Sequence, residues 1–180
     1  MNICVFCSAN NQIADDYFER TEELGRWCAT EGHTIVFGGT NQGLMECLAK
    51  AACEAGGRVT GVIPEIVERG GRTSTYVHHH IWTNTLSDRK DEMIGCADAI
   101  VALPGGVGTL DEVFTVLSAA SIGYHQKRVI LYNINGFWQK LIELMDDLQQ
   151  RGMIRGDWRN QLLIAETFDD LKRLIASIKK

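Results

Sequence analysis

The chain alternates short apolar runs with longer stretches in which apolar residues recur every three or four positions. The short runs predict strands at Asn2–Cys7, Thr34–Phe37, Arg58–Ile63, Tyr76–Thr83, Ala99–Leu103, Val129–Tyr132 and Leu162–Ala165. The longer stretches predict helices at Asp15–Glu31, Gly43–Ala55, Ser87–Gly95, Thr109–Ile122, Phe137–Gln150 and Phe168–Ile178. Continuously apolar strands that alternate with helices are typical of a parallel sheet covered on both faces. We therefore predict a three-layer α/β/α protein that forms one domain over residues 1–180.

The segment 64–74 is polar and interrupted by glycines, and it fits neither pattern. We expect it to be a mobile loop. In an open parallel sheet, ligands bind beyond the carboxyl ends of the strands. A functional site is therefore expected in the turns that follow Cys7, Phe37, Ile63 and Leu103.

Composition narrows the class of protein. The 180 residues are 45% hydrophobic and 23% charged, which is enough for one self-supporting core. A net charge of −5 argues against a nucleic-acid partner. Because no apolar run approaches the ~20 residues of a membrane span and no secretory signal is apparent, we expect a cytoplasmic protein without a membrane partner. Eighteen glycines but only two prolines favour close backbone approaches within a regular fold.

Cysteine and histidine could indicate disulfides or a metal site, but their positions favour neither. The six cysteines, at positions 4, 7, 28, 47, 53 and 96, are expected to be buried, reduced thiols, because a core-rich chain in a reducing compartment needs no disulfides. The Cys4-Val5-Phe6-Cys7 pair lies on a predicted strand, and no second pair follows at zinc-ribbon spacing. The rings of His78, His79 and His80 alternate faces on a strand and are expected to be packed or solvated. We predict no metal site.

The strongest motif is the run Leu103-Pro-Gly-Gly-Val-Gly-Thr-Leu-Asp-Glu112, which leaves an apolar strand and enters a helix. Glycines let the backbone approach a ligand, and the first N–H groups of a helix have no partner within it. With the helix dipole, these donors favour a phosphate. Thr109 adds a hydroxyl. The alternative is a plain turn in which Thr109 caps the helix and Glu112 completes a capping box.

A second glycine-rich turn follows the second predicted strand. Its Gly38-x4-Gly43 spacing is that of a P-loop, but Leu44 and Met45 stand where Lys and Ser or Thr are required. An ATPase is therefore excluded, and neither loop carries the dinucleotide-binding GxGxxG fingerprint. Together the two loops indicate one small phosphorylated ligand.

Charged residues near these loops suggest the chemistry. Arg89, followed by Lys90, begins a predicted helix, and its guanidinium could grip phosphate or ribose oxygens at two points. The alternative is a solvated basic residue between Asp88 and Asp91. Glu112 lies one turn inside the predicted phosphate-binding helix. A carboxylate there would repel phosphate, but it could stabilise positive charge at the anomeric carbon of a neighbouring ribose.

Weaker signals come from the remaining ring side chains. His125 follows the helix that begins at the main motif, where it could line the pocket or cap the helix end. The tryptophans at positions 27, 82, 138 and 158 are expected in the core or an interface rather than in a base-stacking platform.

With these residues, the sequence resembles the LOG ("lonely guy") family, often labelled "possible lysine decarboxylase". The shared segments are Cys4–Cys7, Gly38–Gly39, Gly43–Met45, Gly61–Pro64, Arg89–Lys90, Met93, Asp98–Ala99, Pro104–Glu112, Gly123 and His125. The PGGxGTxxE pattern joined to an upstream Arg-Lys pair is highly specific. The resemblance implies a modified Rossmann-like nucleotide-binding fold and a homodimer. It also implies hydrolysis of the N-glycosidic bond of cytokinin riboside 5′-monophosphates, and commonly of AMP, to free base and ribose 5-phosphate.

The resemblance also implies roles for individual residues. The catalytic pair is matched by Arg89 and Glu112. The phosphate-binding loop is matched by Gly105, Gly106, Gly108 and Thr109, and the substrate pocket is expected to include Ser8, Gly39, Lys90 and Met93. No cofactor is implied. Lysine decarboxylation normally uses pyridoxal phosphate on a Schiff-base lysine, and no lysine here lies in a recognisable context for that cofactor.

The chain departs from the family pattern around the motifs. It has Ser8-Ala9 where the family has Gly-Ser, and Thr40 where a third glycine is usual. Further departures lie at Leu86-Ser87, Thr115, Ala119 and Ser121. Because the loop and the catalytic pair are intact, we predict retained phosphoribohydrolase chemistry with a changed or broadened base preference. The alternative is a non-catalytic carrier of a nucleotide or of the molybdenum cofactor, and a third hypothesis is a structural dimer whose loops are only turns.

Overall fold

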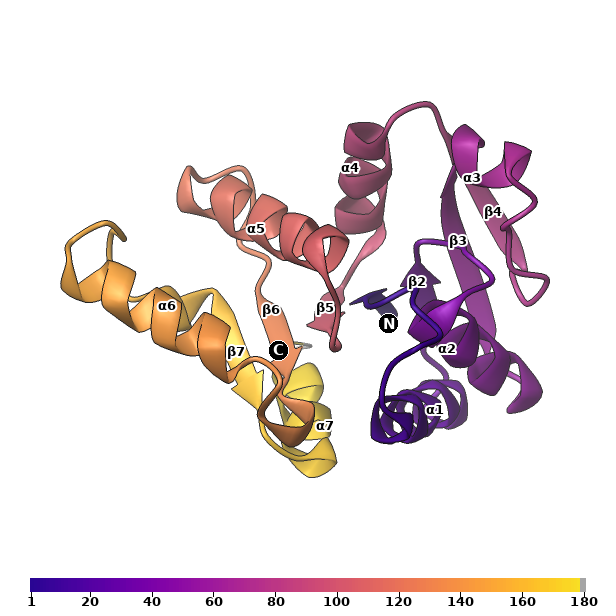
Figure 1. The fold of residues 1–180 in the computed structure, drawn as a ribbon, viewed down its shortest axis with the longest axis horizontal. Coiled ribbons are helices and arrows are strands. Elements are labelled where there is room, and N and C mark those ends of the chain that lie inside the picture. The colour runs from indigo at the N-terminus through magenta and orange to yellow at the C-terminus, as the bar shows by residue number, and fades with distance from the viewer. Residues whose placement is uncertain (179–180) are drawn as a thin grey trace.

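The computed structural model describes residues 1–178 and contains one parallel sheet between two groups of helices (Figure 1). The strands are β1 (Asn2–Phe6), β2 (Thr34–Phe37), β3 (Arg58–Pro64), β4 (His79–Thr83), β5 (Ala99–Ala102), β6 (Val129–Tyr132) and β7 (Leu162–Ala165). Their order is β4-β3-β2-β1-β5-β6-β7, and all neighbouring pairs are parallel. The chain reverses its direction across the sheet between β1 and β5, which is where such sheets open a ligand crevice.

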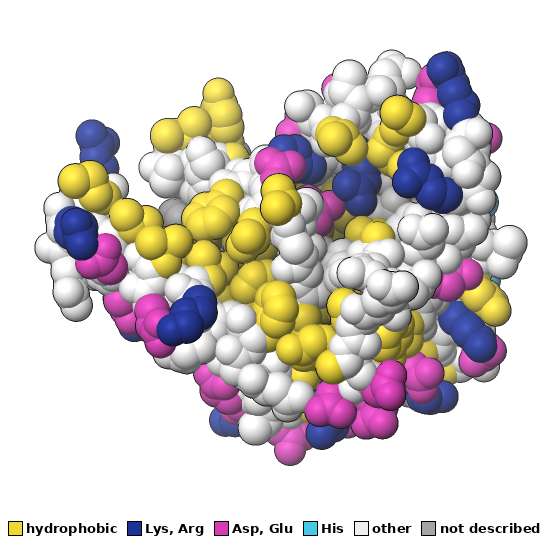
Figure 2. Space-filling view, viewed as in Figure 1, with side chains coloured by type: hydrophobic (Ala, Val, Ile, Leu, Met, Phe, Trp, Pro, Cys, Tyr) yellow, Lys and Arg dark blue, Asp and Glu magenta, His cyan; other side chains and the backbone are white. Residues whose placement is uncertain are grey.

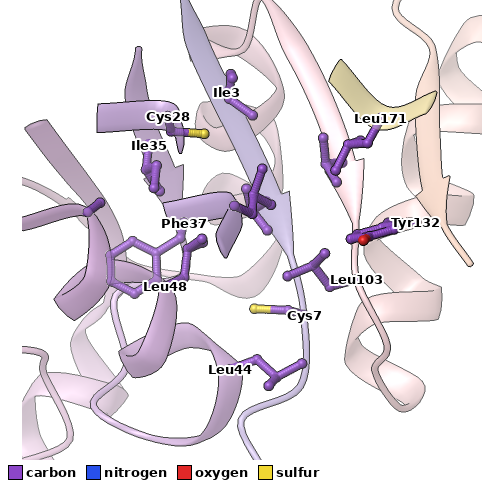
Figure 3. Close-up of a cluster of buried hydrophobic side chains, with 14 of the residues drawn as sticks. Ile3, Cys7, Cys28, Ile35, Phe37, Leu44, Leu48, Leu103, Tyr132 and Leu171 are labelled. Carbon is purple, nitrogen blue, oxygen red and sulfur yellow. The ribbon is translucent and has the colours of Figure 1, made fainter. Parts of the chain in front are cut away.

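The helices pack on the sheet through two buried clusters. They are α1 (Asp15–Thr30), α2 (Gly43–Glu54), α3 (Glu65–Arg69), α4 (Leu86–Cys96), α5 (Val107–Ser121), α6 (Gln139–Gln150) and α7 (Phe168–Ile178). One cluster joins α1, α2 and α7 to Ile3 and Val5 of β1 (Figure 3), and the other joins α4, α5 and α6 to Cys4 and Phe6. Because successive side chains of a strand point to opposite faces, β1 contributes to both clusters. The predicted three-layer α/β fold is confirmed.

The expected mobile loop at 64–74 is wrong in part. Residues Glu65–Arg69 form α3, and the segment after it is hydrogen-bonded to the turn that follows β2. The N–H of Asn41 donates to the carbonyl of Arg72 over 2.9 Å, and the N–H of Ser74 donates to the carbonyl of Gly39 over 2.9 Å. These partners are about thirty residues away in the chain, so local polarity gave no indication of them.

Other boundaries differ from the prediction at turns. Strand β4 begins at His79 rather than Tyr76, because the N–H of Tyr76 donates to the hydroxyl of Ser74 in a turn. Helix α5 begins at Val107, two residues earlier than predicted. Short 3-10 helices at Ile134–Gly136 and Trp158–Asn160 were not predicted.

All six cysteines are free, as predicted, but only Cys4, Cys7 and Cys28 are buried. The other three are half-buried. His79 and His80 are exposed on β4, which is an edge strand. Within residues 1–178, no group of histidine, cysteine and acidic side chains is arranged to hold a metal ion. No helix in the same range combines the length and apolar character that spanning a membrane requires.

Apolar side chains are exposed along α5 and beyond its end. Val107 is 84% exposed and Ile122 68% exposed, and Phe114 and Tyr124 are also exposed. Figure 2 shows hydrophobic side chains gathered where α5 and α6 face the viewer. Such a surface is available for an interface, although the homodimer remains a prediction.

The C-terminus of α4 is held by Lys127, just before β6. The Lys127 ammonium donates hydrogen bonds to the carbonyl oxygens of Ile94, Gly95 (3.2 Å) and Ala97 (2.9 Å). The last carbonyls of a helix lack partners within it and carry the negative end of its dipole, so a cation there is stabilising. This contact anchors the helix that carries Arg89.

We expect Lys127→Met to lower the free energy of unfolding by about 1–2 kcal/mol, because the carbonyls at the end of α4 lose a charged donor. Urea or thermal denaturation followed by circular dichroism measures this. Lys140→Met is the matched control: its side chain is 92% exposed, so its effect should stay below about 0.5 kcal/mol. Equal stability of the two variants would contradict the capping role.

Candidate active site

A cavity of about 500 Å³ lies at the carboxyl ends of the central strands, where a site was expected. Residues of the turn after β1, of α2, of α4 and of the start of α5 line it. They are Cys7, Ser8, Ala9, Asn10, Met45, Arg89, Gly106, Gly108, Thr109 and Glu112. The sequence motifs at Arg89 and at Gly105–Glu112 are thus brought to one place, although they lie on different helices.

Arg89 and Glu112 form an ion pair between α4 and α5. Arg89 Nη1 donates to Glu112 Oε1 over 3.0 Å, and the two side chains are 12% and 4% exposed. Arg89 Nε also donates to the carbonyl of Val62 in β3 over 3.3 Å. The alternative of a solvated Arg89 between Asp88 and Asp91 is therefore wrong.

The environment of Glu112 changes its acidity. Burial raises the pKa of the Glu112 carboxyl from 4.5 to about 7, although the charge and hydrogen bond of Arg89 oppose this rise. The charge of Asp111 adds to the increase, and that of Lys90 acts against it. Both protonation states of Glu112 are therefore accessible near neutral pH, as general acid–base chemistry requires.

A second ion pair runs beside the first. Lys90 Nζ donates to both carboxylate oxygens of Asp111 over 2.8 Å. Since Lys90 follows Arg89 and Asp111 precedes Glu112, the two pairs join α4 to α5 along one short stretch. The Asp111 side chain is 55% exposed, so water screens this outer pair more than the inner one.

The N-terminus of α5 opens onto the cavity. Gly106 is the N-cap, and the N–H of Leu110 makes the first helical hydrogen bond, to the carbonyl of Gly106 over 3.0 Å. The preceding N–H groups of Val107, Gly108 and Thr109 are those for which a helix provides no acceptor. A phosphate placed there would be favoured by these donors and by the helix dipole.

The alternative prediction, a capping box formed by Thr109 and Glu112 at the start of α5, is wrong. Thr109 occupies the third position of α5 rather than its N-cap, and Glu112 is paired with Arg89 instead of reaching back to a cap. Gly105 has a packing role, because a Cβ on it would lie 2.1 Å from the Thr109 hydroxyl oxygen. The turn thus depends on glycine to accommodate the buried Thr109 side chain.

The second glycine-rich turn is used differently from the first. The N–H of Gly43 donates to Asn11 Oδ1 over 2.7 Å, and the N–H of Leu44 donates to the carbonyl of Ser8 over 2.9 Å. Gly43 has a φ of +58°, and a Cβ there would lie 2.5 Å from the backbone of Ala9. The start of α2 therefore holds the turn after β1, and these two N–H groups are already used. The idea that both loops grip one phosphate is not supported.

Of the four residues predicted to line the substrate pocket, one lines the cavity and three do not. Ser8 lines the cavity. Gly39, Lys90 and Met93 are absent from its lining: Gly39 packs on Ile63, Lys90 is paired with Asp111, and Met93 is fully buried in the core. Their proposed role in binding substrate remains a prediction.

Sequence reasoning missed four residues that line the cavity. They are Cys7, Ala9, Asn10 and Met45. Three of them follow the end of β1, so the rule that sites lie at strand ends could have found them. Burial raises the pKa of the Cys7 thiol well above its ordinary value, so Cys7 borders the cavity as a neutral group.

The remaining ring side chains lie elsewhere. His125 lines a separate cavity of about 400 Å³ with Gln126, Arg128 and Asn160. Trp138 and Trp158 are in the core as predicted, whereas Trp82 is 48% exposed on the edge strand.

Known proteins are similar in sequence to most of this chain. A family model described as "Possible lysine decarboxylase" matches residues 45–175. The cytokinin riboside 5′-monophosphate phosphoribohydrolase of Rhodococcoides fascians is 35% identical over 99% of this chain and 89% of that protein. The enzyme of that name called LOG in Oryza sativa subsp. japonica is 34% identical over 94% of this chain and 70% of that protein.

Solved structures with the same fold are described as molybdenum cofactor proteins rather than as phosphoribohydrolases. The molybdenum cofactor binding protein of Rippkaea orientalis matches with a TM-score of 0.77 and 27% identity, over 99% of this chain and 97% of that one. The molybdenum cofactor carrier protein of Chlamydomonas reinhardtii matches with a TM-score of 0.77 at 24% identity, over 99% of this chain and 97% of that one. The second likeness shows the fold alone.

We expect Lys90→Met and Asp111→Asn to shift the pKa of Glu112 in opposite directions. Removing the Lys90 cation leaves the Asp111 charge uncompensated and raises this pKa, whereas removing the Asp111 charge lowers it. Titration of 13C-labelled carboxyl groups by NMR measures both. Shifts of the same sign in both variants would show that the outer pair acts on Glu112 through structure rather than charge.

Proposed function

The chain belongs to the LOG family, whose model is described as "Possible lysine decarboxylase", and from this premise we propose that it hydrolyses the N-glycosidic bond of a nucleoside 5′-monophosphate. The products are the free base and ribose 5-phosphate. One observation carries the proposal: a buried carboxylate, Glu112, is held by Arg89 in the cavity onto which the N-terminus of α5 opens.

The substrate phosphate binds at the start of α5. The N–H groups of Val107, Gly108 and Thr109 and the Thr109 hydroxyl act as donors, with the helix dipole favouring the negative charge. This arrangement explains how a chain with a net charge of −5 takes an anionic substrate without a cationic surface. The ribose then lies toward Glu112, one helical turn further along α5.

The reaction breaks the bond between the ribose C1′ atom and a base nitrogen, and the electron pair leaves with the base. The Glu112 carboxylate stabilises the positive charge that develops at C1′. A water molecule adds to C1′ and gives one proton to Glu112. The base nitrogen takes up one proton from solvent and Glu112 returns its proton to solvent, so that one water molecule is consumed and the carboxylate is restored. Arg89 keeps the carboxylate in place and orients the ribose phosphate.

The alternative chemistry in the family description, lysine decarboxylation, receives no support from the site. It normally requires a lysine that forms a Schiff base with pyridoxal phosphate. Across residues 1–178, the side chains that line the cavity include Arg89 but no lysine. The nearby Lys90 is bound to Asp111 by two hydrogen bonds.

We assign an adenine-type base to the substrate. The relatives are named for cytokinin ribosides, which indicates a purine with a substituent. In this chain Ser8 and Ala9 replace the family's Gly-Ser pair and both line the cavity, so the preference among adenine and its substituted forms is broadened or changed.

A second candidate is a non-catalytic carrier of a nucleotide or of the molybdenum cofactor. The likeness to the Rippkaea orientalis cofactor-binding protein favours it. A carrier would bind its cargo at the start of α5 and release it unchanged. The paired Arg89 and Glu112 favour hydrolysis over carriage, because a carrier has no need of a carboxylate poised near neutral pH.

We expect the purified protein to release free base from AMP or from N6-prenylated AMP, and Glu112→Gln to reduce kcat by about 100-fold or more, because the charge-stabilising carboxylate is lost. Liquid chromatography of the base across AMP, GMP and prenylated AMP measures this. Glu92→Gln, an exposed position on α4, is the matched control and should retain activity. Binding of these nucleotides without any base release would favour the carrier.

The activity should depend on pH through Glu112. Its ionised form is the active one, so kcat/KM should fall about tenfold per pH unit below the pKa of about 7 and level off above it. The residual activity of Glu112→Gln should not show this fall of kcat/KM at low pH, which is the acid limb of the profile. A wild-type profile that is flat from pH 5 to 8 would exclude Glu112 as the group that titrates in catalysis.

A further inference from the structure

The Arg89 guanidinium reaches the cavity through a narrow passage between three elements. Its Nε atom is hydrogen-bonded to the carbonyl of Val62 in β3, and its Nη1 atom is hydrogen-bonded to Glu112 in α5. The third side of the passage is the end of β2, where the chain continues into Gly38. The side chain is 12% exposed, so it has little freedom to move outward.

Gly38 lies directly against the remaining guanidinium nitrogen. A Cβ atom on Gly38 would lie 1.8 Å from Arg89 Nη2 and 2.9 Å from Arg89 Cζ. It would also lie 3.2 Å from the sulfur of Met45. No side chain larger than hydrogen therefore fits at position 38 while Arg89 keeps this conformation.

The backbone does not explain this glycine. Gly39 and Gly43 have positive φ angles, whereas Gly38 does not, so an alanine could adopt its conformation. A Cβ on Gly43 would meet backbone atoms, which cannot move without distorting the fold. A Cβ on Gly38 would meet mainly the tip of a flexible side chain.

We propose that Gly38 is a positioning residue: its missing side chain forms the slot that holds the Arg89 guanidinium against Glu112. The inference rests on the proposed function for its effect on turnover, but the slot itself is a property of the protein without substrate. The charged and titratable groups around Glu112 are Arg89, Lys90 and Asp111 together with the neighbouring thiols of Cys4 and Cys7.

Gly38→Ala should fold normally and lose activity. The new methyl group displaces the guanidinium by an ångström or more, and misplacement on that scale costs about 100-fold in kcat. Because Glu112 then loses the charge and hydrogen bond that oppose the effect of burial, its pKa rises and the acid limb of the pH profile moves to higher pH. A purely structural defect would lower the melting temperature without moving this limb.

A double-mutant cycle with Arg89→Lys isolates the contact. Lysine keeps the charge but has no Nη2 branch for the methyl group to meet. If Gly38 acts through the guanidinium, Gly38→Ala costs about 100-fold in the wild type but less than about twofold in the Arg89→Lys background. Equal losses of kcat in both backgrounds would overturn the proposal.

Gly95→Ala is the matched control, since it lies on α4 beyond Arg89 and a Cβ there meets nothing within 4 Å. It should keep wild-type activity, and the pKa of Glu112 measured by NMR titration should equal that of the wild type.

The same titration can be made if the wild type releases no base. A raised pKa of Glu112 in Gly38→Ala but not in Gly95→Ala then supports the slot even though the proposed function has failed, and an unchanged pKa overturns it. If Gly38→Ala does not fold, recovery of folding by adding Arg89→Lys supports the slot, and no recovery contradicts it.

Discussion

The ion pair between Arg89 and Glu112 is the interaction on which the rest of the site depends. Removing a carboxylate from water costs several kcal/mol unless a counter-charge and hydrogen bonds accompany it, and the Glu112 side chain is 4% exposed. Arg89 provides both, but only because α4 is anchored at its far end by Lys127 and because β2 and β3 leave a passage for its side chain. Arg89 compensates for burial only in part. Burial raises the pKa of Glu112 by more than Arg89 lowers it, so this pKa is about 7. The carboxyl is therefore close to the point of proton exchange near neutral pH.

The fold alone does not decide between a hydrolase and a carrier, since proteins described in both ways share it. A parallel sheet that reverses direction between β1 and β5 provides a crevice whatever the ligand. What differs is the chemistry at its walls. The start of α5 needs only glycines and unpaired N–H groups to hold an anion, which suits either function. A buried carboxylate adjacent to that anion site is costly to maintain, and it has a clear use only where positive charge develops during a reaction. For this reason the proposal of hydrolysis rests on Glu112 more than on the loop.

Much of the architecture could be predicted from the sequence because its signals are local. Apolar runs marked every strand, and helical spacing marked six helices with errors of a few residues. The Pro104–Glu112 motif and Arg89 identify two sides of the cavity from the sequence alone. What could not be predicted depends on contacts between distant segments. The anchoring of Arg72 to the turn after β2, the use of the α2 N-terminus by Asn11 and the burial of Met93 all follow from tertiary packing, and spacing along the chain carries no signal for them.

The two glycine-rich turns look equivalent in the sequence, yet their glycines serve different partners. At the start of α5 they leave the backbone open to the cavity, whereas Gly43 lets the turn after β1 pack on the start of α2, where its N–H groups are already bonded. A single free helix terminus fits one phosphate and not two, which favours a monophosphate over a dinucleotide. In the proposed function the phosphate lies at α5 and the ribose beside Glu112, which leaves the stretch Ser8–Asn10 and Met45 as the part of the lining for the base. Those residues include Ser8 and Ala9, two of the positions where this chain departs from its family. The substitutions therefore bear on which base is released, while the machinery that would break the bond stays as the family has it.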